Sequence, residues 1–269
     1  MVKKLFKHEF IAYGRIMVLL YAILLTISAA TRIIISFESD TLAYNIIRTM
    51  CFIVYFISAL SAMVFSFALA IVRFYKNLFT CEGYLTFTLP VTPSQHILVK
   101  AVTALCMYLT TAVVMLLSVC IVLAGEPLAV VFDTISTVFS KLFDLAGMHT
   151  FLIGGELAIW LLISAFSGIL LYYTYISIGQ LFNKNRILAA VGAYFIHYII
   201  TQILSTIFTV IISLAASSEL IAALFDWVSL HPFASIHIAI WGGTFLSIIG
   251  CAVEFIIIRA IITKKLNLE

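Results

Sequence analysis

Residues 73–100 read RFYKNLFTCEGYLTFTLPVTPSQHILVK and form the longest interruption in an otherwise apolar sequence. Basic residues bound the stretch, with Arg73 and Lys76 near one edge and Lys100 at the other. Between them, residues 77–87 are rich in apolar side chains and predict one short helix, too short to cross a membrane. A short, partly apolar helix between two long apolar runs needs a surface to dock on, because exposed apolar patches usually mark contact sites.

The second half of this stretch carries a helix start signal. Thr92 can cap a helix whose first residue is Pro93, and Gln95 stands three residues after the cap, as in a capping box. Pro90 ends whatever precedes it, because a proline pushes the residue before it out of helical geometry. We therefore expect residues 73–96 to be a connection between two long helices, with a rigid start to the second.

The composition is that of a membrane protein: 64% of residues are hydrophobic and 10% are charged, against about 25% charged in soluble domains. Apolar segments of about 20 residues recur along the chain, each long enough to cross a bilayer. The sequence predicts an all-α, polytopic membrane protein that forms a single transmembrane domain over residues 1–269. The six predicted spans are residues 16–36, 51–72, 94–124, 154–178, 188–215 and 238–262.

The distribution of basic residues predicts the topology. Of the 15 lysines and arginines, 12 fall on one side of the predicted spans. The three on the other side are Arg32, Arg48 and Lys141. Because cytoplasmic segments carry an excess of basic residues, we expect both termini in the cytoplasm. An even number of spans agrees with this expectation.

Three segments outside the spans have apolar residues at helical spacing. In residues 1–15 they are Val2, Leu5, Phe6, Phe10 and Tyr13, with lysines on the other side. This pattern predicts an amphipathic helix lying in the membrane interface; a frayed basic N-terminus is the alternative. Residues 125–150 and 216–236 have similar patterns and predict amphipathic helices on the outer face.

Motifs of enzymatic chemistry are missing from the sequence. It has no G-x-x-x-x-G-K-[ST] phosphate loop and no H-E-x-x-H metal motif. Its five cysteines show no paired spacing, and four lie in apolar runs. We therefore predict no catalytic residues, no metal site, no cofactor and no nucleic-acid partner for this chain. Glu254 lies inside the sixth span, where an interhelical ion pair and a proton or ion relay are both open interpretations.

Two spans carry polar stripes. On the fifth span, polar residues recur every three or four positions and so share one face; they include Tyr194, His197, Tyr198, Thr201 and Ser205. The second span has a weaker stripe of Tyr55, Ser58 and Ser61. Polar side chains in a membrane gather where helices meet helices or water. The stripes therefore predict either helix–helix interfaces or the lining of a translocation path.

The interrupting stretch also resembles a known family. Glu82, the run GYLTFTLPVT over residues 83–92, Ile97-Leu98 and Lys100 resemble the cytoplasmic loop of bacterial ABC-2-type transporter permeases. In that family an acidic residue precedes a leucine-proline turn, and a lysine opens the third span. The six-span plan agrees, although many members lack an outer insert as long as residues 125–150.

The resemblance implies partners and roles. Two permease subunits, identical or different, would form a channel in the bacterial cytoplasmic membrane, and separate ATPase subunits would bind ATP and Mg²⁺. The short helix of the loop would dock into the ATPase, and the second and fifth spans would line the path. The residues predicted to contact the ATPase are Asn77, Leu78, Phe79, Glu82, Tyr84 and Leu85.

The leading hypothesis is thus the permease subunit of an ATP-driven exporter. Aromatic, apolar spans suit an amphipathic or hydrophobic substrate such as an antimicrobial peptide, a drug or a lipid-like molecule. A membrane sensor that docks a cytoplasmic partner through residues 73–96 is the alternative. A secondary transporter is disfavoured, because the sequence lacks two repeated halves with buried ion-coupling acids.

Overall fold

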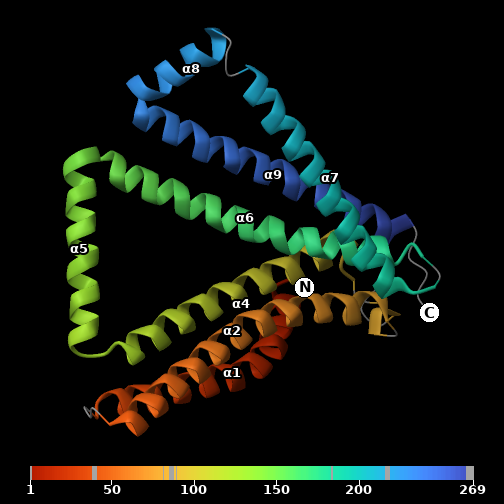
Figure 1. The fold of residues 1–269 in the computed structure, drawn as a ribbon. Coiled ribbons are helices and arrows are strands. Elements are labelled where there is room, and N and C mark those ends of the chain that lie inside the picture. Colours follow the sequence, from red (N-terminus) through yellow and green to blue (C-terminus); the bar gives the residue numbers. More distant parts are fainter. Residues whose placement is uncertain are drawn as a thin grey trace. The chain divides into compact units, whose positions relative to one another are not determined.

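The computed structural model describes residues 2–37, 41–80, 82–84, 88, 90–182, 184–215 and 219–264. Every regular element in these ranges is a helix (Figure 1). The helices are α1 (Val2–Ile35), α2 (Leu42–Phe79), α4 (Pro93–Val122), α5 (Glu126–Ala146), α6 (His149–Gly179), α7 (Arg186–Ala215), α8 (Glu219–Leu230) and α9 (Pro232–Lys264). Six of them, all except α5 and α8, are long and apolar enough to cross a membrane. The predicted all-helical fold with six candidate spans is confirmed.

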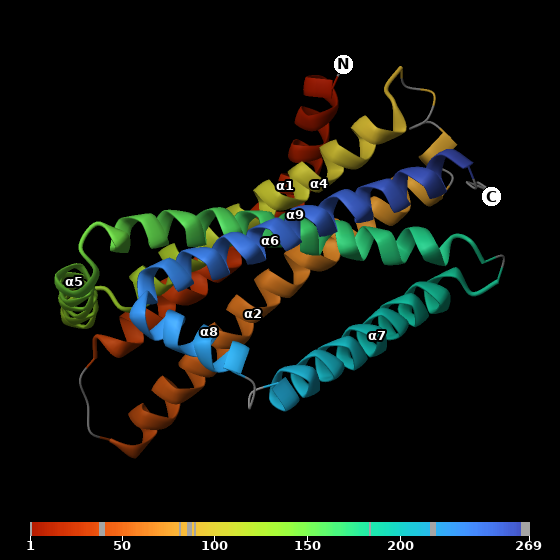
Figure 2. The same cartoon turned by 90° about the horizontal axis from the view of Figure 1, so that it is seen from above.

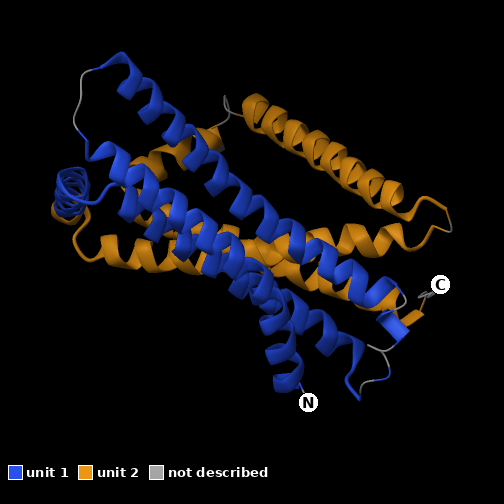
Figure 3. Ribbon diagram, turned by 90° about the horizontal axis from the view of Figure 1, so that it is seen from below, with its two compact units in different colours: residues 1–141 blue, residues 142–269 orange. Residues whose placement is uncertain are grey.

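The chain divides into two compact units, residues 1–141 and 142–269, with the boundary inside α5 (Figure 3). In unit 1, α1 packs against both α2 and α4. Side-chain contacts set the register of these helices, since Glu9 meets Lys100 and Tyr21 meets Thr111. The two residues of each pair are separated by about the same number of positions in the sequence, so α1 and α4 run in the same direction. α2 runs antiparallel to both.

The first helix is longer than the span predicted for it. Residues 2–14 continue into the apolar run without a break, so α1 is one helix of 34 residues. At 1.5 Å per residue such a helix is about 51 Å long, which exceeds the roughly 30 Å of a hydrocarbon core. Figure 2 shows that its N-terminal turns point away from the line of the rest of the helix. An interfacial orientation for these turns stays a prediction.

The prediction of a separate helix over residues 77–87 is wrong at its start. α2 continues through Arg73 and ends at Phe79, so Asn77, Leu78 and Phe79 form its last turn. No helix breaker interrupts the sequence before Thr80, and Leu78 and Phe79 are buried on the same face as the helix core. A further helical turn covers residues 82–84, whereas residues 85–87 lie outside the described part.

The predicted start of α4 is confirmed. The Thr92 hydroxyl accepts a hydrogen bond from the Gln95 backbone amide at 3.4 Å, and the Gln95 side chain accepts one from the Thr92 amide at 3.1 Å. Pro93 is the first helical residue. This capping box satisfies two amides that lack partners within the helix.

Unit 2 is built on α6, which packs against both α7 and α9. α6 and α7 form an antiparallel hairpin that closes tightly at Gly179. A Cβ atom at this position would lie 2.6 Å from the Arg186 carbonyl oxygen, so the close approach requires glycine. α6 and α9 run parallel, because Glu156 meets His237 and, further along both helices, Ser167 meets Glu254.

The two segments predicted as outer helices are helical. α5 covers most of residues 125–150 and buries none of its residues. α8 lies within residues 216–236 and ends just before Pro232, where α9 begins. α8 contacts α9. Their amphipathic placement on a membrane surface stays a prediction.

Candidate functional site

A cluster of charged and polar side chains joins the three helices of unit 1 next to the 80–92 connection. The Glu9 carboxylate of α1 accepts hydrogen bonds from Arg73 at 2.7 Å and Lys100 at 2.6 Å. It also accepts one from the Asn77 amide at 3.1 Å. Arg73 and Asn77 lie just before the connection and Lys100 just after it. One carboxylate therefore binds both flanks of the connection. We call these four residues the Glu9 cluster.

The Glu9 cluster is largely withdrawn from solvent. The side chains of Lys100, Glu9 and Arg73 are 5%, 11% and 20% exposed. Burial of charges is costly, so the two cations depend on the carboxylate for compensation. The single Glu9 carboxylate pairs with both Arg73 and Lys100. Glu82 in the connection also interacts electrostatically with Lys100. The cluster thus joins α1, α2 and α4 through charge pairs. Removing one member of such a pair would destabilise the protein, because the other charge would be left buried and unpaired.

Polar contacts continue along the interior of unit 1. The Tyr13 hydroxyl donates to the Ser66 carbonyl oxygen. The hydroxyls of Tyr21 and Thr111 lie 2.7 Å apart, and Thr111 donates to the Ser66 hydroxyl at 3.1 Å. Each of these side chains is buried. Together they add specific bonds between α1, α2 and α4 in a region where lipid could satisfy none of them.

The residues predicted to contact an ATPase divide into two groups. Leu78 and Phe79 are 0% and 4% exposed and pack inside unit 1, and Asn77 binds Glu9. Glu82 is exposed, and the Tyr84 side chain is 54% exposed. Leu85 lies outside the described residues. The surface that a partner could reach in the described part is therefore centred on Glu82 and Tyr84.

The stripe predicted on the second span is partly an interhelical contact. The Tyr55 hydroxyl of α2 lies 3.0 Å from the Ser118 hydroxyl of α4. The Ser58 hydroxyl donates to the Tyr55 carbonyl oxygen of its own helix at 2.7 Å. Ser61 is exposed. At Tyr55, helix–helix packing within unit 1 accounts for the polar group.

The stripe on α7 is different, because α7 buries none of its residues. Thr201 and Ser205 are exposed, and Tyr194 and Tyr198 are 39% and 55% exposed. His197 is half-buried, with its Nδ1 atom 2.8 Å from the Tyr175 hydroxyl of α6. The predicted stripe is therefore left uncovered by the described part of the chain, as are the apolar faces of the same helix, and its role as the lining of a path stays a prediction.

Comparisons with protein-family models, curated proteins and solved structures found no match. The candidate sites therefore rest on their own geometry.

Glu254 is buried in unit 2, on α9, with 9% exposure. Its carboxylate accepts a hydrogen bond from the Ser167 hydroxyl of α6 at 3.4 Å. In the part of the chain that the structure describes, the ion pairs involve Glu9 and Glu156 and not Glu254. The interpretation of Glu254 as a member of an interhelical ion pair is therefore wrong within the described residues. Among the described residues, it is a buried acid whose hydrogen-bond partner is a hydroxyl, with no basic side chain at ion-pair distance.

A second polar cluster joins the N-terminal parts of α6 and α9. The Glu156 carboxylate accepts hydrogen bonds from His237 Nδ1 at 2.7 Å and from Trp241 Nε1 at 3.0 Å. His237 Nε2 lies 3.1 Å from His149 Nδ1, and the His149 ring stacks on Phe233 at 4.9 Å. Within the described residues, no three His, Cys, Asp or Glu side chains are arranged to hold a metal ion. The hydrogen bonds from His237 and Trp241 to Glu156 join α6 to α9.

Sequence reasoning missed the roles of Glu9 and Glu156. A signal for Glu9 exists, because it continues the buried face of α1 by one helical turn. That face contains Tyr13, Met17, Tyr21, Leu24, Ser28 and Thr31. An acid on the same face, within a basic segment, indicates a buried partner for cations elsewhere in the chain. Its partners could not be identified from the sequence alone.

Proposed function

We propose that this chain is the permease subunit of an ATP-driven exporter, with the 80–92 connection as its coupling element. The observation that carries the proposal is the Glu9 carboxylate bound to both flanks of that connection. The resemblance of residues 82–100 to the ABC-2-type loop agrees with it. In this account ATP and Mg²⁺ belong to separate ATPase subunits, and a second permease subunit completes the channel.

The 80–92 connection joins the end of α2 to the start of α4. A force applied to Glu82 or Tyr84 would act on the last turn of α2, and the capping box at Thr92 gives α4 a rigid start. Both helices are bound to α1 through Glu9, so a displacement would move the three helices as one body. The Glu9 cluster therefore makes a push by a partner effective over the length of unit 1.

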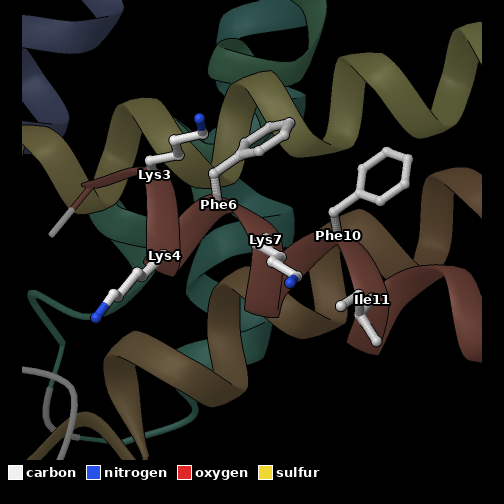
Figure 4. Close-up of a pocket in the computed structure, with 6 residues that line it drawn as sticks. All are labelled: Lys3, Lys4, Phe6, Lys7, Phe10 and Ile11. Carbon is white, nitrogen blue, oxygen red and sulfur yellow. The ribbon is translucent and has the colours of Figure 1, made fainter.

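The same proposal includes a topology. The connection, both termini and most basic residues lie in the cytoplasm, and the membrane is the bacterial cytoplasmic membrane. The N-terminal turns of α1 then meet the membrane interface. Figure 4 shows Phe6 and Phe10 directed to one side of this segment, with Lys4 and Lys7 directed elsewhere. Such a helix suits an interface with anionic lipid headgroups.

The translocation path in this proposal includes the exposed face of α7. Its polar residues are available to water or to a second subunit, as a lumen requires, and they include Thr201 and Ser205. On α2, Ser61 is the one predicted path residue that is exposed. Tyr55 has a packing role instead.

The proposal is tested by co-purification. The tagged chain is isolated from its native membranes in mild detergent, and the recovered proteins are identified by mass spectrometry. We expect an ATP-binding subunit with the wild type, and at least a tenfold loss of it with Glu82→Lys and with Tyr84→Ala. Asp133→Lys and Phe37→Ala make the same chemical changes at exposed positions away from the connection. They should retain the subunit.

Full recovery of the ATPase with both connection variants would show that this segment is not the coupling element. Recovery of a partner without an ATP-binding sequence, lost with the same variants, would favour the sensor alternative.

A further inference from the structure

We propose that α6, α7 and α9 form a binding site for an organic cation, with Glu254 as its counterion and a tyrosine cluster as its aromatic wall. The inference deepens the proposed function by naming a substrate class, and it rests on that function only for the direction of transport. Binding itself requires no ATPase.

The aromatic wall lies where α6 and α7 pack together. Tyr172 and Tyr194 stack with ring centroids 6.5 Å apart, and Tyr175 meets the edge of Tyr194 at 5.8 Å. Tyr194 also stacks on Tyr198 at 6.5 Å, and the Tyr175 hydroxyl bonds to His197. Four tyrosines and a histidine therefore form one connected cluster, and Tyr194 and Tyr198 are its exposed members. The electron-rich faces of such rings attract ammonium groups within about 6 Å.

Part of this wall is open to a ligand. Tyr194 and Tyr198 are 39% and 55% exposed, whereas Tyr175 is buried behind them and holds the hydrogen bond to His197. On a membrane-spanning helix, tyrosine hydroxyls beside a polar stripe indicate contact with protein, water or a polar ligand, because lipid cannot satisfy their hydrogen bonds. The buried Tyr175 fixes the position of the exposed rings, so the wall is formed before a ligand arrives.

Glu254 supplies the charge. Its carboxylate is buried and meets the Ser167 hydroxyl, and no basic side chain in the described chain pairs with it. A carboxylate in apolar surroundings without a partner is costly, and a bound cation would remove that cost. A bound cation would therefore neutralise the Glu254 carboxylate, and the aromatic wall would attract the same cation.

The carboxylate and the wall are close enough to act together. Ser167, which binds Glu254, precedes Tyr172 by five residues and Tyr175 by eight on the same helix, which is about 8–12 Å along its axis. Glu254 also interacts electrostatically with Tyr175. In a medium of low dielectric constant, attraction to a cation at the wall still acts over this distance. An ammonium or phosphonium ion with apolar substituents offers the positive charge for Glu254 and the apolar surface for the tyrosines.

The test uses the purified full chain in lipid nanodiscs and two probes of the same shape and opposite charge. Equilibrium dialysis measures binding of tetraphenylphosphonium and of tetraphenylborate, with empty nanodiscs as the blank. We expect saturable binding of the cation and none of the anion above the blank. Glu254→Gln should weaken cation binding about tenfold or more, because the charge attraction is lost. Tyr194→Ala should weaken it about 3- to 30-fold.

Two variants serve as controls. Tyr194→Phe keeps the aromatic face and should bind the cation within about twofold of the wild type. Asp226→Asn removes an exposed acid on α8 in the same unit and should leave binding unchanged. Equal binding of the two probes, or wild-type affinity in Glu254→Gln and Tyr194→Ala, would overturn the proposal. Because no ATPase is present, these outcomes are independent of the co-purification test.

Discussion

Replacing Glu9 with glutamine should destabilise the protein more than any comparable change to an exposed acid. The substitution keeps the shape of the side chain and an oxygen that can accept a hydrogen bond, but it removes the charge that two cations share. Lys100 then loses its ion-pair partner while its side chain is only 5% exposed, and its interaction with Glu82 compensates the charge only in part. Arg73 is 20% exposed and can turn toward solvent, so its contribution is smaller.

The size of the effect follows from the burial of this pair. Breaking a buried ion pair by removing one partner costs about 3–5 kcal/mol, mostly because a charge is left unpaired. We expect about 3 kcal/mol for Glu9→Gln, at the lower end, since the glutamine still accepts a hydrogen bond. The free energy of unfolding is measured by denaturant titration of the purified protein in detergent micelles, followed by circular dichroism.

A double-mutant cycle separates the charge effect from general damage. Lys100→Met removes the buried cation and keeps an unbranched apolar side chain of similar length. The double variant Glu9→Gln/Lys100→Met should be more stable than Glu9→Gln alone, because no buried Lys charge is left unpaired. Asp133→Asn, at an exposed position of α5, should change stability by less than about 0.5 kcal/mol. Strict additivity in the cycle, or an effect of Glu9→Gln as small as this control, would refute the reasoning.

Two further predictions concern the exposed surfaces. In a cysteine-free background, Thr201→Cys should react with a water-soluble, membrane-impermeant thiol reagent, because Thr201 lies on the exposed polar face of α7; reaction only with lipid-soluble reagents would place that face in lipid. The triple variant Lys3→Gln/Lys4→Gln/Lys7→Gln should co-purify with less anionic lipid than the wild type, as native mass spectrometry can measure, because each lysine near an anionic surface contributes about 1 kcal/mol. An unchanged lipid profile would contradict the interfacial position of α1.

The number and type of the long helices could be predicted because their cause is local. A run of about 20 apolar residues can be buried only in a bilayer or in a large protein core, and such runs can be recognised in the sequence. The start of α4 was also local, since the Thr92 cap, Pro93 and Gln95 stand within four residues of one another. Both predictions are confirmed.

The end of α2 could not be placed from the same kind of signal. Arg73 and Lys76 suggested that the helix had left the apolar region, but charged residues do not break helices. What extends the helix is tertiary packing, because Leu78 and Phe79 are buried against the rest of unit 1. Composition alone gives no information about such burial.

The Glu9 cluster could not be predicted from the sequence for a related reason. Glu9 is separated from Arg73 by 64 residues and from Lys100 by 91. Their meeting depends on the register of three helices, which the sequence does not state directly. The same holds for Glu156 and His237, which are 81 residues apart. The polar stripe on α7 could be predicted because all its members belong to one helix.

If the 80–92 connection contacts an ATPase, a photoreactive group at position 84 should crosslink to that ATPase. A photoreactive phenylalanine analogue replaces Tyr84, whose side chain is 54% exposed. Native membranes are then irradiated, and the crosslinked protein is identified by mass spectrometry. We expect a crosslink to a protein with a nucleotide-binding phosphate loop, and no such crosslink when the analogue replaces Phe37. A crosslink from position 84 only to lipid, to this chain itself or to a protein without such a loop would contradict this expectation.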